Sequence, residues 1–407
     1  MVFDSSFLSK KGKIKKKEIK IVEKVTEDII NIGVNDRTIT LFEGQYEVKN
    51  GMAYNSYVIL DEQVVVMDTV DPRATQEWLK NLDEAVGTRR VDYLVIQHME
   101  PDHGGSIVQL MECYPEMKLV GNAKTFQMFE QFFDVSSSDK MVTVKEGDIL
   151  SVGKHTLQFF MAPMVHWPEV MVTYEQTEKV LFSADGFGKF GTRDAKEDWV
   201  QEARRYYINI CGKYGMQVQA LLKKASTLEI NIICPLHGPV LTENLGYYIE
   251  KYNIWSSYEP EDEGVLIACA SIHGHTLHTA EKMKEILEQK GAKKVVLIDL
   301  TREDLHEAVA DAFRYRYLVL AAASYDAGVF PPMEDFLNKI KAKNYQKRMI
   351  GIIENGSWAP TAAKSMKSLL EGAKALTIVE PVVTIKSAMK TENISQLEAL
   401  ADALLKL

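Results

Sequence analysis

The sequence predicts a two-domain protein of mixed α/β and α+β class, in which an αββα sandwich is followed by a doubly wound parallel sheet. The first observation is the length, because 407 residues can form two domains with separate hydrophobic cores. The second is a series of short β-branched runs between Gly, Asn and Asp turns, which is typical of a sheet rich in antiparallel strands. The third is the alternation of apolar runs with amphipathic helical stretches in the later part of the chain.

Strands dominate the chain from Lys20 to about Ser183. The expected strands are TITLF, NSYVIL, VVVMD, YLVIQ, TLQFFM, VMVTY and KVLFS, with a helical pattern between them at Thr75 to Ala85. Helices are expected from about Glu197 to Lys224, followed by the strand INIICPLH and a last helix near Asn244 to Tyr252. This order of elements fits an αββα sandwich.

A polar and acidic segment, SSYEPEDEG at Ser256 to Gly264, marks the domain boundary. Beyond it, the apolar runs GVLIACA, KVVLIDL, YLVLAAA, RMIGIIE and ALTIVEP alternate with helical stretches, which predicts five strands and five helices in a doubly wound parallel sheet. We therefore expect a lysine-rich N-terminal extension at 1–19, a first domain at 20–256, a linker at 257–263 and a second domain at 264–407.

Composition argues against several classes of protein. The net charge of −9 argues against a nucleic-acid-binding protein. No stretch reaches the roughly 18 consecutive apolar residues of a membrane span, and Met1 to Ser9 lacks the apolar region of a secretory signal. We therefore expect a cytoplasmic protein without membrane contact. The lysines between Lys10 and Lys20 predict a solvated tail, and a contact with an acidic partner protein or a nucleic acid is the alternative.

The cysteines narrow the choice of metal ligands. The sequence has four of them, Cys113, Cys211, Cys234 and Cys269, and no CxxC pair. They therefore provide neither a rubredoxin-type iron site, nor a zinc ribbon, nor an evident disulfide framework. Any metal must be bound by histidine and carboxylate side chains.

Seven histidine and carboxylate residues of the first domain follow apolar runs, at the points where loops begin. They are His98, Glu100, Asp102, His103, His166, Asp185 and His237. The first four lie within six positions after the run YLVIQ, in a loop that can direct several side chains to one point. Histidine and carboxylate at this density are ligands of iron, manganese or zinc, so we predict a metal site.

For any one of these residues, a structural role in the core is the alternative. Of the five histidines before residue 260, however, only His155 lies away from such a strand end, so the set as a whole favours a metal site. The glycines Gly186, Gly188 and Gly191 match the pattern GxGxxG after a strand. A nicotinamide site is disfavoured there, because no apolar helix follows and Asp185 beside them is better used as a ligand.

Three loops of the second domain are expected to bind a mononucleotide, because all three follow the carboxyl ends of strands in the same predicted sheet. They contain Ser271, His273, Gly274, His275 and Thr276; Ser324, Tyr325, Asp326, Ala327 and Gly328; and Asn355, Gly356, Ser357 and Trp358. The first loop opens a helix with small and hydroxyl residues, which present N–H and OH groups to a phosphate. For that loop alone, an ordinary strand-to-helix turn is the alternative.

These motifs together resemble a known family. The order of metal ligands is similar to that of the metallo-β-lactamase superfamily, whose hydrolases carry H-x-H-x-D-H, then a His, a bridging Asp and a final His. Glu100 stands where those hydrolases have the second His, which is the mark of the flavodiiron proteins. The segment SIHGHT resembles the flavodoxin phosphate loop, and SYDAGVFPP and ENGSW resemble the segments that enclose the flavin in flavodiiron proteins. The resemblance covers about residues 20 to 405 and implies a metallo-β-lactamase-like domain followed by a flavodoxin-like FMN-binding domain.

The resemblance also implies the cofactors, two non-haem irons and one FMN. Its implied ligands are His98, Glu100 and His166 for one iron and Asp102, His103 and His237 for the other, with Asp185 bridging them. The same seven residues are then the catalytic ones. In some members of the family water replaces the histidine that matches His103, so both arrangements are open for His103. Glu100 favours iron over zinc, because an additional carboxylate stabilises the oxidised metals and zinc has no redox chemistry.

The implied activity is the reduction of dioxygen to water, of nitric oxide to nitrous oxide, or of both. Electrons would come from rubredoxin or a similar small donor through FMN, in a head-to-tail homodimer or a dimer of dimers. The aromatic residues Trp167, Tyr206 and Tyr207 would line the pocket, and core packing is the alternative for each. A dizinc hydrolase with a fused flavodoxin domain is the first alternative function. An electron carrier or redox sensor with a vestigial metal site is the second.

Overall fold

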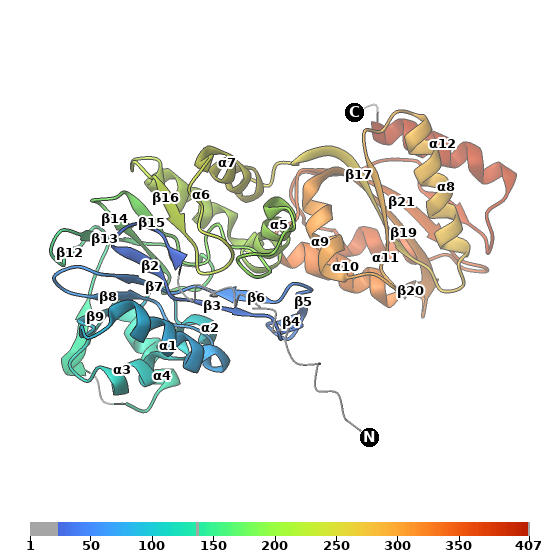
Figure 1. The fold of residues 1–407 in the computed structure, drawn as a ribbon. Coiled ribbons are helices and arrows are strands. Elements are labelled where there is room, and N and C mark those ends of the chain that lie inside the picture. Colours follow the sequence, from blue (N-terminus) through green and yellow to red (C-terminus); the bar gives the residue numbers. More distant parts are fainter. Residues whose placement is uncertain (1–22, 136–137, 406–407) are drawn as a thin grey trace, which may run out of the picture.

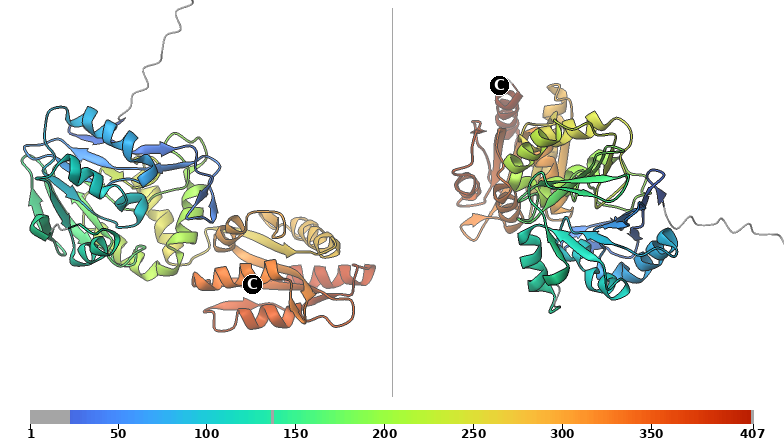
Figure 2. Two further views of the ribbon diagram at one scale, coloured as in Figure 1. Left: turned by 90° about the horizontal axis from the view of Figure 1, so that it is seen from below. Right: turned by 90° about the vertical axis from the view of Figure 1, so that its left-hand side faces the viewer.

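The computed structural model describes residues 23–135 and 138–405, so the lysine-rich extension expected at 1–19 lies outside the described residues. The described chain forms two layered parts, side by side in an elongated molecule (Figures 1 and 2). The predicted fold class is confirmed, since a two-sheet sandwich precedes a parallel sheet covered by helices. In these described ranges no helix is long and apolar enough to cross a membrane.

Two sheets form the centre of the first part. The larger contains β1 (Glu23–Lys24), β2 (Ile29–Asn31), β7 (Tyr57–Ile59), β8 (Val65–Met67), β9 (Tyr93–Val95), β10 (Lys118–Gly121) and β11 (Met141–Thr143), in that order. The smaller contains β12 (Ile149–Ser151), β13 (Thr156–Met161), β14 (Met171–Glu175), β15 (Val180–Phe182) and β16 (Ile232–Cys234), in that order. Two short ribbons pair β3 (Val34–Asp36) with β6 (Met52–Tyr54) and β4 (Leu41–Phe42) with β5 (Tyr46–Glu47).

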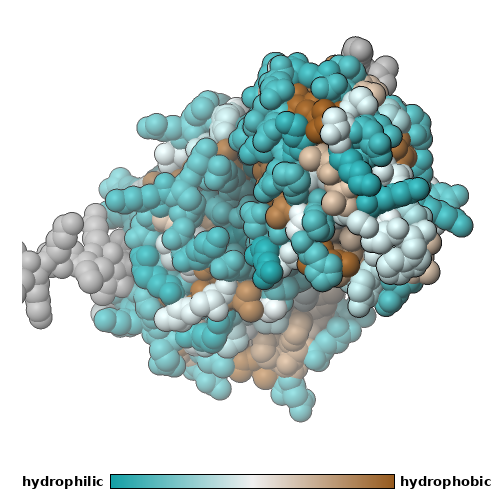
Figure 3. Space-filling model, turned by 90° about the vertical axis from the view of Figure 1, so that its right-hand side faces the viewer, coloured by the Kyte–Doolittle hydropathy of each residue, from teal (hydrophilic) through white to brown (hydrophobic). Residues whose placement is uncertain are grey.

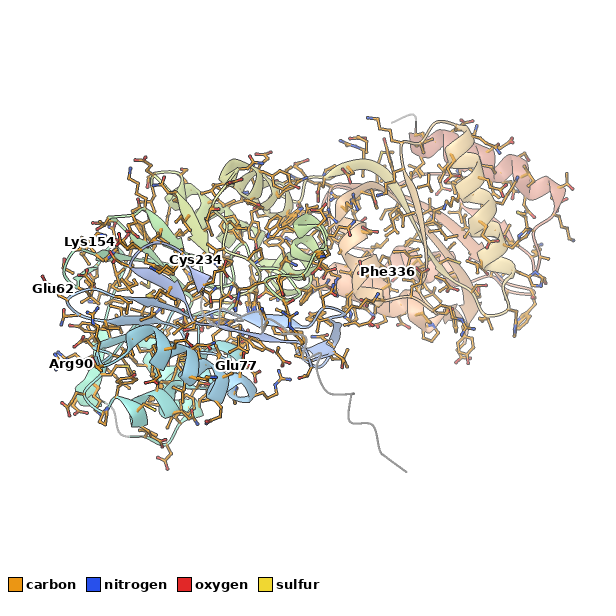
Figure 4. All side chains as sticks on the ribbon, viewed as in Figure 1. Glu62, Glu77, Arg90, Lys154, Cys234 and Phe336 are labelled. Carbon is orange, nitrogen blue, oxygen red and sulfur yellow. The ribbon has the colours of Figure 1, made fainter. Side chains whose placement is uncertain are left out.

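The facing sides of the two sheets form one core, which includes Val95, Phe159 and Cys234, the last of them labelled in Figure 4. Helices pack on the outer faces: α1 (Thr75–Val86), α3 (Ile107–Cys113) and α4 (Ala123–Phe132) on the larger sheet, and α5 (Trp199–Ile210), α6 (Gly215–Ala225) and α7 (Leu245–Ser256) on the smaller. A short helix, α2 (Pro101–Gly104), follows β9, and single 3-10 turns lie at Pro72–Ala74, Ser138–Lys140 and Gly212–Tyr214. Because both faces of β7 and β8 are covered, these strands are apolar throughout.

The predicted strand TITLF is mostly loop. Only Leu41 and Phe42 pair as a strand, in the ribbon β4–β5. The carboxylate of Asp36 accepts hydrogen bonds from the backbone N–H groups of Thr38 and Ile39, at 2.8 and 3.1 Å. This local bond turns the chain and competes with strand pairing.

The second part is a parallel sheet with helices on both faces. Its strands are β18 (Val295–Asp299), β17 (Asp262–Ala270), β19 (Tyr315–Tyr325), β21 (Arg348–Asn355) and β22 (Leu376–Ile378), in spatial order, with β20 (Gly328–Val329) beside β19 and β23 (Val383–Ile385) beside β21. Its helices are α8 (His275–Gln289), α9 (Leu305–Arg314), α10 (Pro331–Ala342), α11 (Ala362–Leu369) and α12 (Thr391–Leu405). The order 2-1-3-4-5 is that of flavodoxin-like sheets. Phe336 of α10, labelled in Figure 4, is fully buried here.

A buried carboxylate joins the two parts. Glu261 precedes β17 and accepts hydrogen bonds from Arg204 of α5 at 2.6 Å and from Lys251 and Trp255 of α7 at 2.7 and 2.8 Å. Helices α5 and α9 lie against each other across this junction (Figure 1). Arg204 also donates a second hydrogen bond at 3.1 Å, so one carboxylate accepts four hydrogen bonds at this junction.

Candidate metal centre and cofactor loops

All seven predicted metal ligands lie together in the structure, at one edge of the sandwich. His98 lies in the loop after β9, Glu100 directly precedes the short helix α2, and Asp102 and His103 lie within that helix. His166, Asp185 and His237 lie in the loops that follow β13, β15 and β16. Six of the seven are at most 9% exposed, and the Glu100 side chain is 15% exposed. The side chains form two groups, with His98, Glu100, His166 and Asp185 in one and Asp102, His103 and His237 in the other.

The first group is compact around the ring nitrogens of two histidines. His166 Nε2 lies 3.0 Å from Glu100 Oε2 and 3.0 Å from Asp185 Oδ2. His98 Nε2 lies 3.2 Å from Glu100 Oε2 and 3.3 Å from His166 Nε2. Atoms that bind one metal at about 2.1 Å lie roughly 3.0 to 3.5 Å from each other. The spacing in this group therefore matches a single metal ion.

The second group has the same spacing and shares Asp185 with the first. His103 Nε2 lies 3.0 Å from His237 Nε2 and 3.2 Å from Asp102 Oδ2. Asp185 turns Oδ2 to the first group, whereas its Oδ1 lies 3.3 Å from His103 Nε2 and 3.7 Å from His237 Nε2. One carboxylate thus faces both groups, which is the arrangement of a bridging ligand.

The chemistry of these atoms fits a pair of cations. His98 Nδ1 is 2.8 Å from Glu169 and His237 Nδ1 is 2.7 Å from the carbonyl oxygen of Ala53, so each ring can donate from Nδ1 and would present the lone pair of Nε2 to a bound metal ion. Both oxygens of Asp102 and of Asp185 are buried without a hydrogen bond from any described residue. Buried acceptors without donors are costly, and a metal ion would satisfy all of them at once.

The pKa shifts of the carboxylates in the site also favour bound cations. Burial raises the pKa of Asp102 to about 7, and the nearby carboxylates of Glu100 and Asp185 add to this. Burial opposes ionisation of Glu100 too, but its contacts with His166 and His98 hold its pKa well below the usual range. Without a bound cation, burial therefore favours the protonated form of Asp102 more than water does. Bound cations would replace such protons, because metal ligands must be deprotonated.

Two buried carboxylates support the ligands and were not predicted from the sequence. Glu169 is fully buried and accepts from His98 Nδ1 and from the backbone N–H of Met99 at 2.8 and 2.9 Å. Asp68 accepts from the backbone N–H groups of Gln97 and His98 at 2.7 and 3.2 Å. Asp68 ends the apolar run VVVMD, so the strand-end pattern could have identified it, whereas no pattern marks Glu169.

The aromatic residues divide between the site and the core. The Trp167 ring lies 5.3 Å from the ring of His98, and the Tyr206 ring lies 5.4 Å from the ring of His237, centroid to centroid. Tyr207 packs on Tyr252 at 5.1 Å, within the helical layer. Core packing, the alternative interpretation, therefore describes the contacts of Tyr207.

The remaining histidine of the first domain belongs to a salt-bridge network. His155 is fully buried between Glu175, at 3.0 Å, and Asp28, at 3.3 Å. Asp28, His155 and Glu178 lie close enough to hold a cation, but the ammonium group of Lys154 is 2.6 Å from Asp28 and 3.3 Å from Glu178. The amine supplies the positive charge of this cluster.

The three predicted cofactor loops follow β17, β19 and β21 at neighbouring carboxyl ends of the parallel sheet. In the first, His273, Gly274 and His275 are exposed at the start of α8, while Thr276 is 2% exposed. Each loop also exposes one large apolar side chain: Ile272 is 40%, Tyr325 46% and Trp358 93% exposed. Exposed apolar side chains on adjacent loops make this end of the sheet a candidate surface for binding another molecule.

Several polar groups of the loops bond within the protein. Ser271 Oγ accepts from the backbone N–H of Gly274, and Ser324 Oγ accepts from the N–H groups at the start of α11. Asp326 and Ala327 have positive φ and form the two-residue turn between β19 and β20. Asn355 Nδ2 donates to the carbonyl oxygen of Ser387, which brings a fourth loop, after β23, beside the third.

Known proteins resemble the chain in sequence and in fold. The family model described as ODP family beta lactamase matches residues 52–238. A nitric oxide reductase from Moorella thermoacetica is 27% identical over 388 residues, which are 91% of this chain and 95% of that protein. The solved structure of rubredoxin oxygen:oxidoreductase from Desulfovibrio gigas has a TM-score of 0.88 at 24% identity and covers 95% of this chain and 98% of its own. The flavodiiron protein from Giardia intestinalis also has a TM-score of 0.88 at 24% identity and covers 94% of this chain and 95% of its own.

Proposed function

Because the chain has the fold of the flavodiiron proteins over nearly its whole length and a nitric oxide reductase relative of matching length, we propose that it is a flavodiiron oxidoreductase. It reduces dioxygen to water, nitric oxide to nitrous oxide, or both. The observation that carries the proposal is the geometry of Asp185, whose two buried oxygens face two separate ligand groups. A site for two metals in a protein with a flavodoxin-like sheet supports redox chemistry rather than hydrolysis.

The seven side chains would divide between two irons. His98, Glu100 and His166 would hold one iron, and Asp102, His103 and His237 the other, with Asp185 between them. Two such irons would supply electrons together to one bound gas molecule or to a pair of them. The geometry of His103 supports its role as a ligand rather than a water in its place, because Nε2 lies within 3.3 Å of Asp102, Asp185 and His237.

We further propose that FMN binds at the loops after β17, β19 and β21. The phosphate would lie at the N-terminus of α8, where Thr276 and the backbone N–H groups of the first loop can donate to it. The ring would lie among the exposed side chains of Ile272, Tyr325 and Trp358, which it would cover. Trp358 of the third loop is 93% exposed and would stack on the ring.

The working unit would be a head-to-tail homodimer or a dimer of dimers. Strand β17 leaves the junction at Asp262 and runs nine residues, about 30 Å, before the first cofactor loop begins. The neighbouring strands are parallel to it, so all three loops lie at the end of the sheet away from the junction. A second copy would bring its metal site to this end. Light scattering should give the mass of two or four chains, and an active monomer would refute the arrangement.

A small carrier such as rubredoxin would deliver the electrons. The face of the second part shown in Figure 3 is mainly hydrophilic with small hydrophobic patches, which suits a transient contact more than a permanent one. A cytoplasmic location, expected from the sequence, stays a prediction.

Cofactor analysis and rapid kinetics test the function. Two irons and one FMN per chain, with oxidation of the reduced protein by dioxygen or nitric oxide in an anaerobic stopped-flow experiment, would support it. Zinc without flavin would identify the dizinc hydrolase instead. Flavin without metal would identify an electron carrier or redox sensor.

A further inference from the structure

An apolar cavity of about 30 Å³ lies between the smaller sheet and helix α6. One water-sized molecule needs roughly 10 to 15 Å³ of such space, so the cavity can hold a diatomic molecule. Its walls are Phe160, Val172 and Leu181 from the sheet and Val218, Leu221 and Leu222 from α6. This space is separate from the polar contacts between the metal ligands.

The hydroxyl groups that border the cavity are engaged by the backbone. Ser183 Oγ donates to the carbonyl oxygen of Gly186 at 2.6 Å, and the Tyr252 hydroxyl accepts from the N–H of Phe187 at 2.6 Å. Lys224 also borders it, but its ammonium group binds the carbonyl oxygen of Met161 and the carboxylate of Glu146, each at 2.9 Å. A buried water needs two to four free polar partners, so this cavity is dry.

The walls of the cavity come from two kinds of segment. Leu221, Leu222 and Leu228, in and just after α6, are half-buried. Val165 and Gly186, in the loops after β13 and β15, are fully buried. These two residues are the chain neighbours of the predicted ligands His166 and Asp185. A molecule in the cavity is therefore next to the loops that carry one terminal ligand and the bridging ligand.

We propose that this cavity binds a small apolar gas and supplies it to the metal centre; the identity of that gas as the substrate rests on the proposed function. Dioxygen and nitric oxide are uncharged and weakly polar, so an apolar space takes them up in preference to water. The other approach to the site passes Glu100 and His166, which are the two partly exposed ligands. That approach is lined by groups that bind water. The cavity separates the path of the gas from the path of water and protons.

Xenon tests the cavity without any assumption about activity, because it is an apolar gas of similar size. Crystals of the full protein under xenon pressure should show an anomalous peak between α6 and the smaller sheet. The absence of a peak there would overturn the proposal.

A substitution that fills the cavity tests the route. Val218→Phe adds a ring to the helical wall and so fills the cavity. The matched control is Val86→Phe, which adds the same volume to α1 on the other outer face of the sandwich. Leu221→Phe, at a half-buried position, serves if the first variant does not fold.

Both cavity variants should raise the KM for the gas at least about threefold while kcat, iron content and FMN content stay at the wild-type values, because access is changed and chemistry is not. The control variant should leave KM unchanged. An unchanged KM in both folded cavity variants, or an equal rise in the control, would overturn the proposed route. Wild-type protein that binds xenon but reduces neither gas would instead refute the proposed function and leave the cavity established.

Discussion

Glu169 allows a direct test of the proposed metal site. Its carboxylate accepts from Nδ1 of His98 at 2.8 Å and from the N–H of Met99 at 2.9 Å, so it orients the ring and makes Nε2 a stronger donor to a metal. Glu169→Gln retains an oxygen that can accept the same bonds but removes the charge. A hydrogen bond to a charged group contributes about 1.5–3 kcal/mol, against about 0.5–1.5 kcal/mol for a neutral one. The midpoints of these ranges differ by about 1.2 kcal/mol, which corresponds to a factor of about 8 to 10 in Fe²⁺ affinity.

The chain offers a matched control for this substitution. Glu175 is also fully buried, and its carboxylate lies 3.0 Å from Nδ1 of His155, in a salt-bridge network outside the metal centre. In both pairs burial opposes ionisation of the carboxylate, and the histidine outweighs burial and lowers the carboxylate pKa. Glu175→Gln should therefore cost similar folding stability and leave iron affinity unchanged.

Anaerobic competition with a chromogenic chelator would measure Fe²⁺ affinity for wild type and both variants. Glu169→Gln should bind one of the two irons about tenfold more weakly, within the range usual for groups that orient metal-bound histidines. An affinity within twofold of wild type would refute the role of Glu169. An equal loss in Glu175→Gln would show that the effect is one of general stability.

The other predictions concern the ligand set, the flavin and the junction. Glu100→His should lower the iron content while FMN content stays the same, as measured by metal analysis; full iron retention would contradict the charge argument. Thr276→Val should weaken FMN binding about tenfold by fluorescence titration, because a hydroxyl donor to the phosphate is lost, with iron content unchanged. The pKa of Glu261 is lowered to about 2, so its stabilising effect is complete above about pH 4.5 and is lost as the pH falls toward 2. Glu261→Gln should cost at most about 3 kcal/mol in urea unfolding at pH 7, whereas Glu263→Gln, which breaks an exposed pair with Arg316, should cost less than about 1 kcal/mol.

Periodicity predicted the class and order of elements because each sheet is covered on at least one face. The strands β17, β19 and β21 are nearly continuous apolar runs, as parallel strands between two helical layers must be. The interpretation of TITLF as a strand was wrong because one side chain, Asp36, bonds to the backbone two and three residues later. Such a local bond leaves no mark in a hydrophobic pattern.

The seven predicted ligands could be picked out of the sequence because they lie in the segments that directly follow apolar runs. Their partition into two groups came only from the resemblance to the flavodiiron proteins, since it depends on how four loops approach each other. The contact between Glu169 and His98 depends on the same approach of loops, because the two residues are 71 positions apart in the sequence. The cavity beside α6 could not be predicted either, because Val218 and Leu181 have the sequence pattern of ordinary core residues.

The charges of the site explain why the chain places so many carboxylates around few histidines. Glu100, Asp102 and Asp185 give three negative charges among the predicted ligands, and Glu169 adds a fourth through His98. Four negative charges balance two divalent cations in a buried site, where a net charge is costly. Oxidation of both metals then leaves only two uncompensated positive charges, against three if Glu100 were a histidine. Glu100→His and Glu169→Gln each remove one negative charge, but only Glu100 would touch a metal. A comparison of the two variants therefore separates the effect of charge from the loss of a ligand.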